Sequence, residues 1–558
     1  MNDTLKTLIF VAVAALAAVA ALASRPSATT STGAKAVRDQ LLCPDLKNPL
    51  DVAGIEIAKY DETRGDVSVI QVVRTENAAG QRHWVIPSHD DYPADSKTQV
   101  ALVPAAMMGL KIVEMVSDDI GAQQEFGVID PDPKTLQSGA TGVGERIVLK
   151  NKANGRDLLA LVIGKEVPKQ PNPNLRYVRK VGELPVYIVE IATDKLSTNF
   201  EDWIEPNLLG INLLKMKQLR IHDYSIRKTE EGPALTMRSR TVLDFDESTE
   251  AKWKLVANQK YSTSAQAKEG DPWVDIKMAA NEELDTAKLD ELRTALGDLK
   301  IVDVNRKPKG LSENLRLSAD FSQDEAIQLA LRGFYVGRLS KDGPVELCSG
   351  DGEFRVLMED GVEYVLRFGE IAGATAKKPD GEKGEKSKKD KKDVGKTPGK
   401  KGDGLNRYIL VMAEFNPEIV SKPKLLPLPE PVKEKPSAKP EEKAGKKDEK
   451  KDAKAEKNGA KKDDAQKPLT AKEKYEAERR RVEKENRRLQ EEYEQQLADG
   501  KKHVAELNAR FADWYYIIPD DVYGKIHLGR ADIIKKKEPK EKKAAGADAE
   551  HQHEHVHE

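Results

Sequence analysis

Apolar positions recur at helical spacing across residues 286–304, TAKLDELRTALGDLKIVDV. The apolar stripe consists of Leu289, Leu292, Ala295, Leu296 and Leu299. Residues three and four apart share one helix face, so the pattern predicts an amphipathic helix. Asp285 stands just before it and is a suitable N-cap. We therefore expect one helix here that packs a single face on a core.

An earlier stretch of the chain repeats this pattern. Its apolar positions, in the same spacing, are Val100, Val103, Ala106, Met107 and Leu110. Both stretches continue into similar runs typical of a strand, LKIVEM from Leu110 and LKIVDV from Leu299. Pro104 interrupts only the earlier stretch, and proline inside a helix should bend it or restart it.

Further similar segments follow one another in the same order along both halves. The pairs are 54–61 with 218–225, Trp84 with Trp253, 161–167 with 366–372, 176–178 with 407–409, and Phe-x-Asp-Trp at 200–203 with 511–514. The segment 187–196 is a second match for the run that begins at Tyr408, so the local register stays open. Collinear order favours a duplicated domain over coincidence among short apolar strings. The offset grows along the chain, as it would if the second copy had accepted insertions.

Alternation of apolar and polar residues predicts strands with one wet face. It is clear in VSVIQVV (67–73), RIVLKN (146–151) and FRVLM (354–358). Predicted strands outnumber helices, and most connections resemble hairpins. This favours the α+β class: two tandem related domains, 50–215 and 216–533, each a mostly antiparallel sheet with a packed helix.

Two polar segments interrupt the second domain. Residues 374–406 and 421–468 are dominated by Lys, Glu, Pro and Gly and contain few apolar side chains. Too little apolar burial is available to offset the entropy of ordering them, so both inserts are predicted to be disordered.

A long polar helix is predicted over residues 469–500. Thr470 and Glu473 fit a capping box, and Gly500 suits a helix end. Tyr475, Val482 and Leu489 recur every seven residues, but the remaining heptad positions are mostly charged. A solvated helix with Glu–Lys and Glu–Arg pairs is one interpretation, and a weak coiled-coil contact with a partner is the other.

The N-terminal residues suggest export. After a short flank, 1–7, residues 8–24 form an apolar run (LIFVAVAALAAVAALAS), and residues 25–49 resemble a flexible tether. The run is marginal in length for a transmembrane helix, and Ala21-Leu22-Ala23 also resembles a signal-peptide cleavage site. We expect a retained single-pass anchor in the inner (cytoplasmic) membrane with the bulk of the chain extracytoplasmic; cleavage is the alternative.

Composition adds little chemistry. The formal net charge is −2 and 33% of residues are charged, so no basic excess points to nucleic acid. Cys43 and Cys348 are the two cysteines, and the sequence leaves open whether they pair. The tail 534–558 is predicted to be disordered. Its alternating His551, His553, His555 and His557 can chelate a divalent ion, but without a supporting shell we assign no metal role.

No segment carries a convincing catalytic motif. Asp130-Pro131-Asp132-Pro133 and His89-Asp90-Asp91 bring carboxylates together, yet both also fit turns. Residues 139–144, GATGVG, precede a predicted strand rather than a helix and so lack the context of a phosphate loop. Trp203 and Trp514 are most simply buried anchors of the core, and a shared ligand groove lined by both is the alternative interpretation. We assign no catalytic, cofactor-binding or metal residue, and no cofactor.

A family resemblance rests on the order of several short motifs. These are Trp84-x-Ile86-Pro87, Asp95 before a helix, LKIVE, Phe126-Gly127-Val128 with Asp130-Pro131, LVIGKE and LRYVR. Together they resemble the bacterial domain of unknown function family 4340 (DUF 4340), over most of 50–215 and more loosely beyond. The resemblance implies an N-terminal membrane helix and, in some members, association with ABC transport systems of the gliding-motility type. It implies no catalytic residues.

Three hypotheses for function follow. The first is a non-enzymatic, membrane-tethered extracytoplasmic scaffold or accessory protein with a membrane or envelope protein partner, associated with an ABC-type transport or gliding-motility-type system. The second is a module that binds a cell-envelope glycan or small ligand between the two repeat domains. The third is a hydrolase, which converging carboxylates or histidines in a pocket would support.

Overall fold

The computed structural model describes eight stretches of the chain. They are residues 37–77, 80–151, 155–230, 232–262, 272–340, 343–372, 405–430 and 470–537. The segment 8–24, most of the inserts 374–406 and 421–468, and the histidine tract all lie outside these residues. Among the described helices, none is both long and apolar enough to cross a membrane.

The first large sheet is nine-stranded and antiparallel, in the order β4-β3-β2-β1-β6-β7-β8-β9-β5. Its strands are β1 (Gly54–Asp61), β2 (Asp66–Glu76), β3 (Arg82–Ile86), β4 (Tyr92–Pro93), β5 (Ile112–Ser117), β6 (Glu145–Lys150), β7 (Asp157–Glu166), β8 (Leu175–Lys180) and β9 (Val186–Glu190). Helix α3 (Gln99–Ala106) links β4 to β5, and α4 (Gln123–Phe126) precedes β6. Short 3-10 turns are η1 (Pro49–Asp51), η2 (Pro87–His89), η3 (Ile120–Ala122), η4 (Phe200–Trp203) and η5 (Leu213–Lys215).

The second large sheet is also nine-stranded, in the order β13-β12-β11-β10-β18-β19-β20-β21-β15. Its strands are β10 (Met216–Thr229), β11 (Gly232–Phe245), β12 (Trp253–Tyr261), β13 (Trp273–Asp275), β15 (Asp303–Arg306), β18 (Glu353–Met358), β19 (Val362–Ile371), β20 (Asn406–Phe415) and β21 (Trp514–Pro519). Two small sheets pair β14 (Glu282–Leu284) with β22 (Ile534–Lys536) and β16 (Phe334–Gly337) with β17 (Glu346–Ser349). The helices are α5 (Thr286–Gly297), α6 (Gln323–Ala330), α7 (Ala471–Phe511), α8 (Asp520–Ile526) and α9 (Arg530–Ile533).

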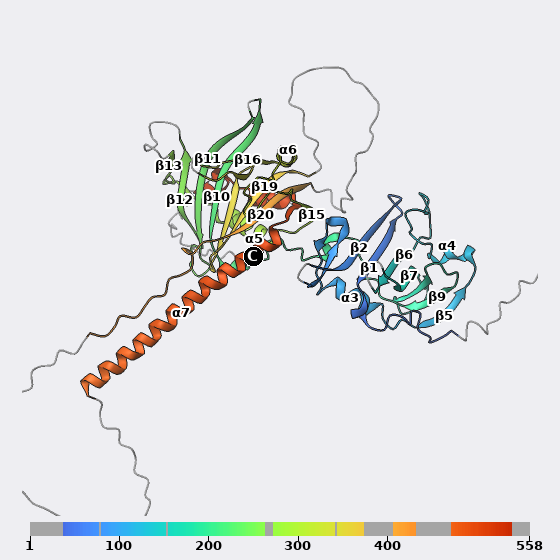
Figure 1. Cartoon of the computed structure of the whole chain (residues 1–558). Coiled ribbons are helices and arrows are strands. Elements are labelled where there is room, and N and C mark those ends of the chain that lie inside the picture. The colour runs from blue at the N-terminus through green and yellow to red at the C-terminus, as the bar shows by residue number, and fades with distance from the viewer. Residues whose placement is uncertain are drawn as a thin grey trace, which may run out of the picture.

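The two large sheets have the same strand order once each is numbered from its own first strand. β1–β4 correspond to β10–β13, β5 to β15, and β6–β9 to β18–β21. A helix joins the fourth strand to the edge strand in both, α3 in the first and α5 in the second. Figure 1 shows the two sheets as neighbouring bodies. The predicted α+β class with two mainly antiparallel sheets is confirmed.

The predicted helix after Asp285 is present as α5, and its apolar stripe is buried. Leu289, Leu292 and Leu296 are at most 1% exposed, and the Asp285 side chain accepts a hydrogen bond from Lys288 N. The corresponding helix of the first sheet, α3, is shorter than α5 and contains Pro104. Both helices lie in one continuous apolar cluster that joins the two sheets.

The interpretation of the two Phe-x-Asp-Trp motifs as equivalent ends is wrong. Phe200–Trp203 forms η4, which follows the ninth strand of the first sheet. Phe511 instead ends α7, and Trp514 begins β21, which is itself the corresponding strand. Four residues are too few to fix a register when both tryptophans serve mainly as buried anchors, at 0% and 6% exposure.

Helix α7 continues past the predicted end at Gly500. A Cβ at this position would lie 2.2 Å from Asp360 O and 2.7 Å from the Phe415 ring. Gly500 is therefore required for close packing at the base of the helix and does not serve as a C-cap. The predicted capping box is present, since Thr470 and Glu473 exchange side-chain-to-backbone hydrogen bonds.

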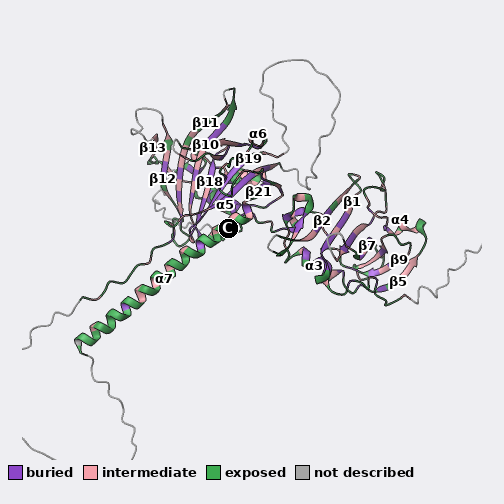
Figure 2. Cartoon of the chain, viewed as in Figure 1, coloured by how far each residue is buried: buried purple, intermediate pink, exposed green. Residues whose placement is uncertain are grey.

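The outer part of α7 extends away from the second sheet, and Figure 2 shows it as largely exposed. The whole of α7 spans 41 residues, or about 60 Å at the usual helical rise. Residues 421–430, which the sequence predicts to be disordered, are among the described residues. They contact α7. The Asn486 side chain accepts a hydrogen bond from Leu426 N at 2.7 Å and donates one to Leu426 O at 2.9 Å. This segment is richer in leucine and proline than the lysine-rich remainder of the insert.

Candidate functional site

The second sheet places ionised side chains on the face opposite its apolar core. Along β18, Phe354 and Val356 point into the core cluster, and the alternating Glu353 and Arg355 point away from it. Arg367 of β19 lies directly across from Glu353 in the strand register. The alternation therefore brings charges from neighbouring strands together on one face.

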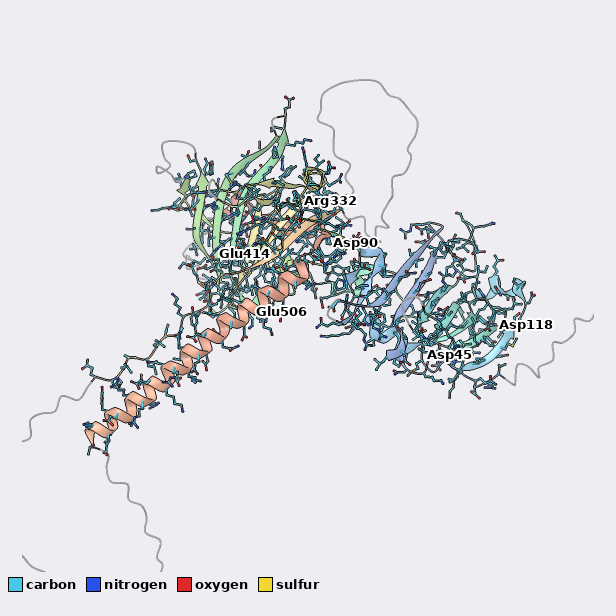
Figure 3. All side chains as sticks on the ribbon, in the orientation of Figure 1. Asp45, Asp90, Asp118, Arg332, Glu414 and Glu506 are labelled. Atoms are coloured by element: carbon cyan, nitrogen blue, oxygen red, sulfur yellow. The ribbon has the colours of Figure 1, made fainter. Side chains whose placement is uncertain are left out.

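Glu353 is the centre of an ion-pair network. Its side chain is 0% exposed and lies 2.6 Å from Nε of Arg355 and 2.7 Å from the Arg367 guanidinium. Arg367, itself 1% exposed, also contacts Glu346 at 3.0 Å and donates to Leu347 O at 2.6 Å. Arg355 reaches further to Glu363 at 3.1 Å and to Glu414 at 2.8 Å. Figure 3 labels Glu414 beside the base of α7.

The network keeps Glu353 charged. Burial alone would raise the pKa of this carboxyl, but the guanidinium groups of Arg367 and Arg355 outweigh it and lower the pKa to about 2. The pKa of neighbouring His222 is also lowered, which for an imidazole favours the neutral form. Burial lowers its pKa to about 4 despite the attraction of Glu353, so the imidazole is neutral near pH 7. The site thus combines a fixed carboxylate with a neutral imidazole.

A cavity of about 160 Å³ opens beside this network. Its walls come from β10, β11, β13, β17, β18 and the loop after β16. The polar lining includes His222, Asp223, Tyr224, Ser239, Arg240, Ser340, Glu346, Glu353 and Arg355, and Met237, Leu339 and Trp273 complete it.

A β-bulge shapes the wall of this cavity. The pairing of β10 with β11 shifts between Asp223 and Tyr224, which leaves Arg238 as the extra residue. The Arg238 guanidinium binds Asp223 Oδ1 at 2.6 Å, Ser225 Oγ at 2.8 Å and Tyr224 O at 3.1 Å. Bulges redirect side chains next to sites, and here the arginine holds the bulge in place.

The Tyr224 hydroxyl is fully buried, beside the backbone N–H of Ser349. Its side chain is 1% exposed, and burial raises its pKa well above the usual value. The corresponding tyrosine of the first sheet, Tyr60 of β1, accepts a hydrogen bond from Gly139 N at 3.1 Å. The two matching tyrosines therefore lie beside different backbone groups, Gly139 in the first sheet and Ser349 in the second.

The junction between the two sheets is filled by aromatic side chains. Tyr92 of β4 contacts Phe200 at 5.6 Å and Trp514 at 5.0 Å between ring centroids. His89 stacks on Phe200 at 4.0 Å and lies 3.5 Å from Asp303 of β15. Figure 3 shows the adjacent residue, Asp90, between the two bodies. Trp203 and Trp514 are both buried here, so they line no open groove.

The linker between the sheets is also tied down. Leu208 N donates to Leu299 O at 2.9 Å, and Ile301 N donates to Pro206 O at 2.8 Å. Arg510, near the end of α7, donates to Asn207 O at 2.8 Å. The last turns of α7 therefore hold the linker as well as the second sheet.

The motifs considered from the sequence have structural roles. Asp130 pairs with Arg146 at 3.2 Å, and the Asp132 side chain accepts from Lys134 N in a turn. Asp90 and Asp91 both have positive φ, of 54° and 63°, as expected for a turn. In the glycine-rich stretch, a Cβ on Gly142 would lie 2.2 Å from Gln124 O, which explains glycine by packing.

The cavity residues were missed by the sequence reasoning. No motif singles out His222, and none singles out the charged positions of β18 and β19. A signal was present, because Glu353, Arg355, Glu363 and Arg367 interrupt the apolar residues of two predicted strands. The pairing of these strands decides which charged side chains come into contact, and such a pattern does not show that pairing.

Among the described residues, no group of three His, Cys, Asp or Glu side chains is placed to hold a metal ion. The four C-terminal histidines lie outside them. Cys43 and Cys348 are both free thiols, and Cys348 is buried. Burial raises the pKa of Cys348 to about 12, so its thiol stays protonated.

The family model described as Domain of unknown function (DUF4340) matches residues 84–316. The matched stretch begins at Trp84 in β3 and ends after β15, so it crosses both large sheets. No curated protein and no solved structure matches the chain.

Proposed function

Since residues 84–316 belong to the DUF4340 family, a domain of unknown function, we propose a role for the chain from its own geometry. The chain acts as a non-catalytic, membrane-tethered extracytoplasmic scaffold or accessory protein. Its two joined sheets form the body, and the outer part of α7 is the arm that contacts a membrane or envelope protein. The association with an ABC-type transport or gliding-motility-type system, implied by the family resemblance, is part of this proposal.

The arm is the observation that carries the proposal. Over residues 472–499, α7 has one partly covered face, whose Asn486 binds Leu426; along it lie Tyr475, Val482, Asn486, Leu489, Tyr493 and Leu497. We call these six residues the arm stripe. An exposed helix of this length needs many favourable side-chain pairs to stay folded, and Arg479–Glu483 and Arg488–Glu492 are two of them. A helix maintained in this way and fixed at one end is suited to contacting another protein.

The base of α7 supports the idea of a fixed arm. Asn508 donates to Ala413 O at 2.8 Å and accepts from Ala413 N at 2.9 Å. His503 lies 3.0 Å from Asp360, and Phe511 is 0% exposed. A force applied to the outer part of α7 would therefore be transmitted to β20 and to the linker between the sheets.

We also infer that the two sheets arose by duplication. The shared strand order is one reason, and a shared contact is another. Arg176 and Arg407, at matching positions of β8 and β20, donate to the glycine carbonyls Gly164 O at 3.5 Å and Gly369 O at 2.5 Å. Both glycines are also packed where a Cβ would lie within 2.4 Å of a backbone oxygen. Duplication gives a body with two similar surfaces, as suits a scaffold.

Site-specific photo-crosslinking in intact cells tests the arm. A photoreactive residue in place of Leu489 should form a crosslink to another protein that fractionates with membranes. With the probe at Leu497, the double substitution Leu489→Glu and Tyr493→Glu, which adds two negative charges to the arm stripe, should abolish the crosslink that the Leu497 probe forms without it. The matched control is Gln495→Glu with Ala498→Glu, which adds the same charge on the exposed face of the helix.

The outcomes separate the parts of the proposal. Loss of the crosslink in the stripe variant and its retention in the control support an arm interface. Equal crosslinking in both, or none from the original protein, contradicts it. Proteolysis of spheroplasts tests the location independently, because a protein tethered outside should be cut without lysis of the cells.

A second candidate function is binding of a small ligand. The sequence placed such a site between the two sheets, where Tyr92, Phe200 and Trp514 fill the junction. The described cavity beside Glu353 is a better location for it.

A further inference from the structure

Residues 421–430 (SKPKLLPLPE) run beside the outer part of α7 without regular secondary structure, and we call them the strap. The strap starts at the base of the helix, where Val420 is 3% exposed and its side chain lies 3.0 Å from the position of a Cβ on Gly361. It reaches the outer half of the helix at Leu426, whose backbone N–H and carbonyl both bind the Asn486 side chain. Figure 1 draws this stretch along the line of α7, from the second sheet toward the tip of the helix.

Prolines set the extended conformation of the strap. Proline fixes its own φ and disfavours the helical region for the residue before it, so Pro423, Pro427 and Pro429 restrict most of this stretch. In the resulting polyproline II conformation, every third residue returns to the same face. Pro423 and Pro429 are half-buried, and Leu426 lies midway between them with its backbone bound to Asn486. One face of the strap therefore lies against the helix.

The strap and the helix match in length and in repeat. At the polyproline rise of about 3.1 Å per residue, the path from Val420 to Leu426 spans about 19 Å. Helix α7 covers about 21 Å between Gly500, at its base, and Asn486. The inward face of the strap repeats about every 9 Å, and two helical turns take about 11 Å. The strap therefore lies flat along the arm stripe and does not cross it.

The contact at Asn486 recognises the main chain of the strap. The Asn486 amide accepts from Leu426 N and donates to Leu426 O, so it does not read the identity of the side chain. Val482 lies one turn further out on the same helix face and is 8% exposed, which adds a covered apolar contact. Leu425 and Leu428 are 54% and 53% exposed, so much of the apolar surface of the strap stays in contact with solvent. An extended segment that buries more of its apolar side chains on this face would bind better.

We propose that the arm stripe is a recognition surface for an extended proline- and leucine-rich protein segment, which the strap occupies when no partner is bound. A partner segment of the same kind takes the place of the strap. This rests on the proposed function, because it names what the partner presents to the arm. Occupation by the strap itself is a property of the isolated chain and is tested without the partner.

Fluorescence anisotropy with a labelled peptide tests the surface. The probe is a synthetic peptide of residues 419–430, added to the full chain and to a strap-replaced chain, in which residues 421–430 are changed to glycine and serine. The strap-replaced chain should bind the peptide in the micromolar range. The original chain should bind it about tenfold more weakly or worse, because a strap linked to the same surface has an effective concentration of about a millimolar.

Two substitutions in the strap-replaced chain test the main-chain contact. Asn486→Ala should weaken peptide binding about tenfold or more, since two hydrogen bonds to the peptide backbone are lost. The matched control is Gln490→Ala, which also removes a side-chain amide from α7, but one that contacts Glu494, and it should leave binding unchanged. Both changes introduce alanine, the best helix former, so equal helix content by circular dichroism shows that the arm is intact.

Two further measurements test the extended conformation and the exchange. A peptide with alanine in place of its three prolines should bind the strap-replaced chain about threefold to tenfold more weakly, because proline orders the free peptide in advance. In cells, replacing the strap should strengthen the photo-crosslink from Leu489, because the surface is then open to the partner.

Any one of five results would overturn the proposal. The strap-replaced chain does not bind the peptide up to millimolar concentration, or the original chain binds it equally well. Asn486→Ala binds the peptide as tightly as Gln490→Ala does, or the alanine peptide binds as tightly as the original peptide. The crosslink from Leu489 forms but is no stronger without the strap. Peptide binding without any crosslink in cells would instead contradict the proposed function, so the two failures are distinguishable.

Discussion

At the scale of single residues, the buried carboxylate of Glu353 is the charged group on which the stability of the second sheet depends most. A charge without exposure is tolerated only when it is paired, and three of its neighbours are cationic or can become so. Removing one partner from such a network leaves the others uncompensated. The energetic role of Glu353 is therefore larger than that of any exposed ion pair on the same face.

The substitution Glu353→Gln should cost about 3–5 kcal/mol of unfolding free energy near pH 7, because Arg367 and Arg355 lose their shared carboxylate. The pKa of Glu353 is lowered from 4.5 to about 2, so the folded state favours its ionised form. That stabilisation is complete above about pH 4.5 and is lost as pH falls toward 2. Urea denaturation at several pH values measures the difference.

The control for this prediction is Glu359→Gln. Glu359 pairs with Lys215 at 2.9 Å, but both side chains are at least 40% exposed. Exposed pairs contribute about 0–1 kcal/mol, so this variant should be nearly neutral. Equal effects of the two substitutions would contradict the role of burial.

At the scale of elements, the base of α7 depends on close approach rather than on helix propensity. Gly500 is an unfavourable residue inside a helix, yet only glycine allows Asp360 and Phe415 to come this near. The strand–helix hydrogen bonds of Asn508 with Ala413 lie two turns further on. Packing at these positions fixes where the arm leaves the body.

The substitution Gly500→Ala should destabilise the base of α7 by roughly 1–3 kcal/mol, because its Cβ would lie 2.2 Å from Asp360 O. Hydrogen exchange at Ala413 N and along β20 should become faster. Gly524→Ala in α8 is the matched control, since its Cβ meets no atom within 4 Å. It should be neutral or stabilising by about 0.5–1 kcal/mol, and slower exchange in Gly500→Ala would refute the account.

At the scale of the whole molecule, the two sheets behave as one body because they share a core and a bound linker. The apolar cluster is continuous from the first sheet into the second. Tyr92 contributes a ring to this contact, buried between Phe200 and Trp514. A large apolar junction of this kind opposes relative motion of the two parts.

Replacing Tyr92 with Ala should loosen the junction, at a cost of about 3–5 kcal/mol for a buried aromatic ring. We expect a larger radius of gyration in small-angle scattering and faster proteolysis of the linker at 204–215. Tyr261→Ala is the control, because it removes a ring of the same size that contacts Trp273 at the far edge of the second sheet. If both variants scatter alike, the junction does not depend on Tyr92.

The sequence by itself determined the local features. The α5 stripe and its Asp285 cap, the alternating strands and the Thr470–Glu473 capping box all follow from interactions within a few residues, which a periodic pattern records. The order of similar segments also gave the two-part α+β architecture. Trp84 and Trp253 do occupy matching strands, β3 and β12.

Only the tertiary structure decided the features that depend on strand pairing and close packing. The Phe-x-Asp-Trp motifs occupy different positions, and Gly500 lies inside a helix, because neighbours distant in sequence set both. The meeting of Glu353 with Arg367 likewise depends on register, and the position of Arg238 depends on a bulge. A one-dimensional pattern shows that a side chain faces away from the core, but not which strand lies beside it.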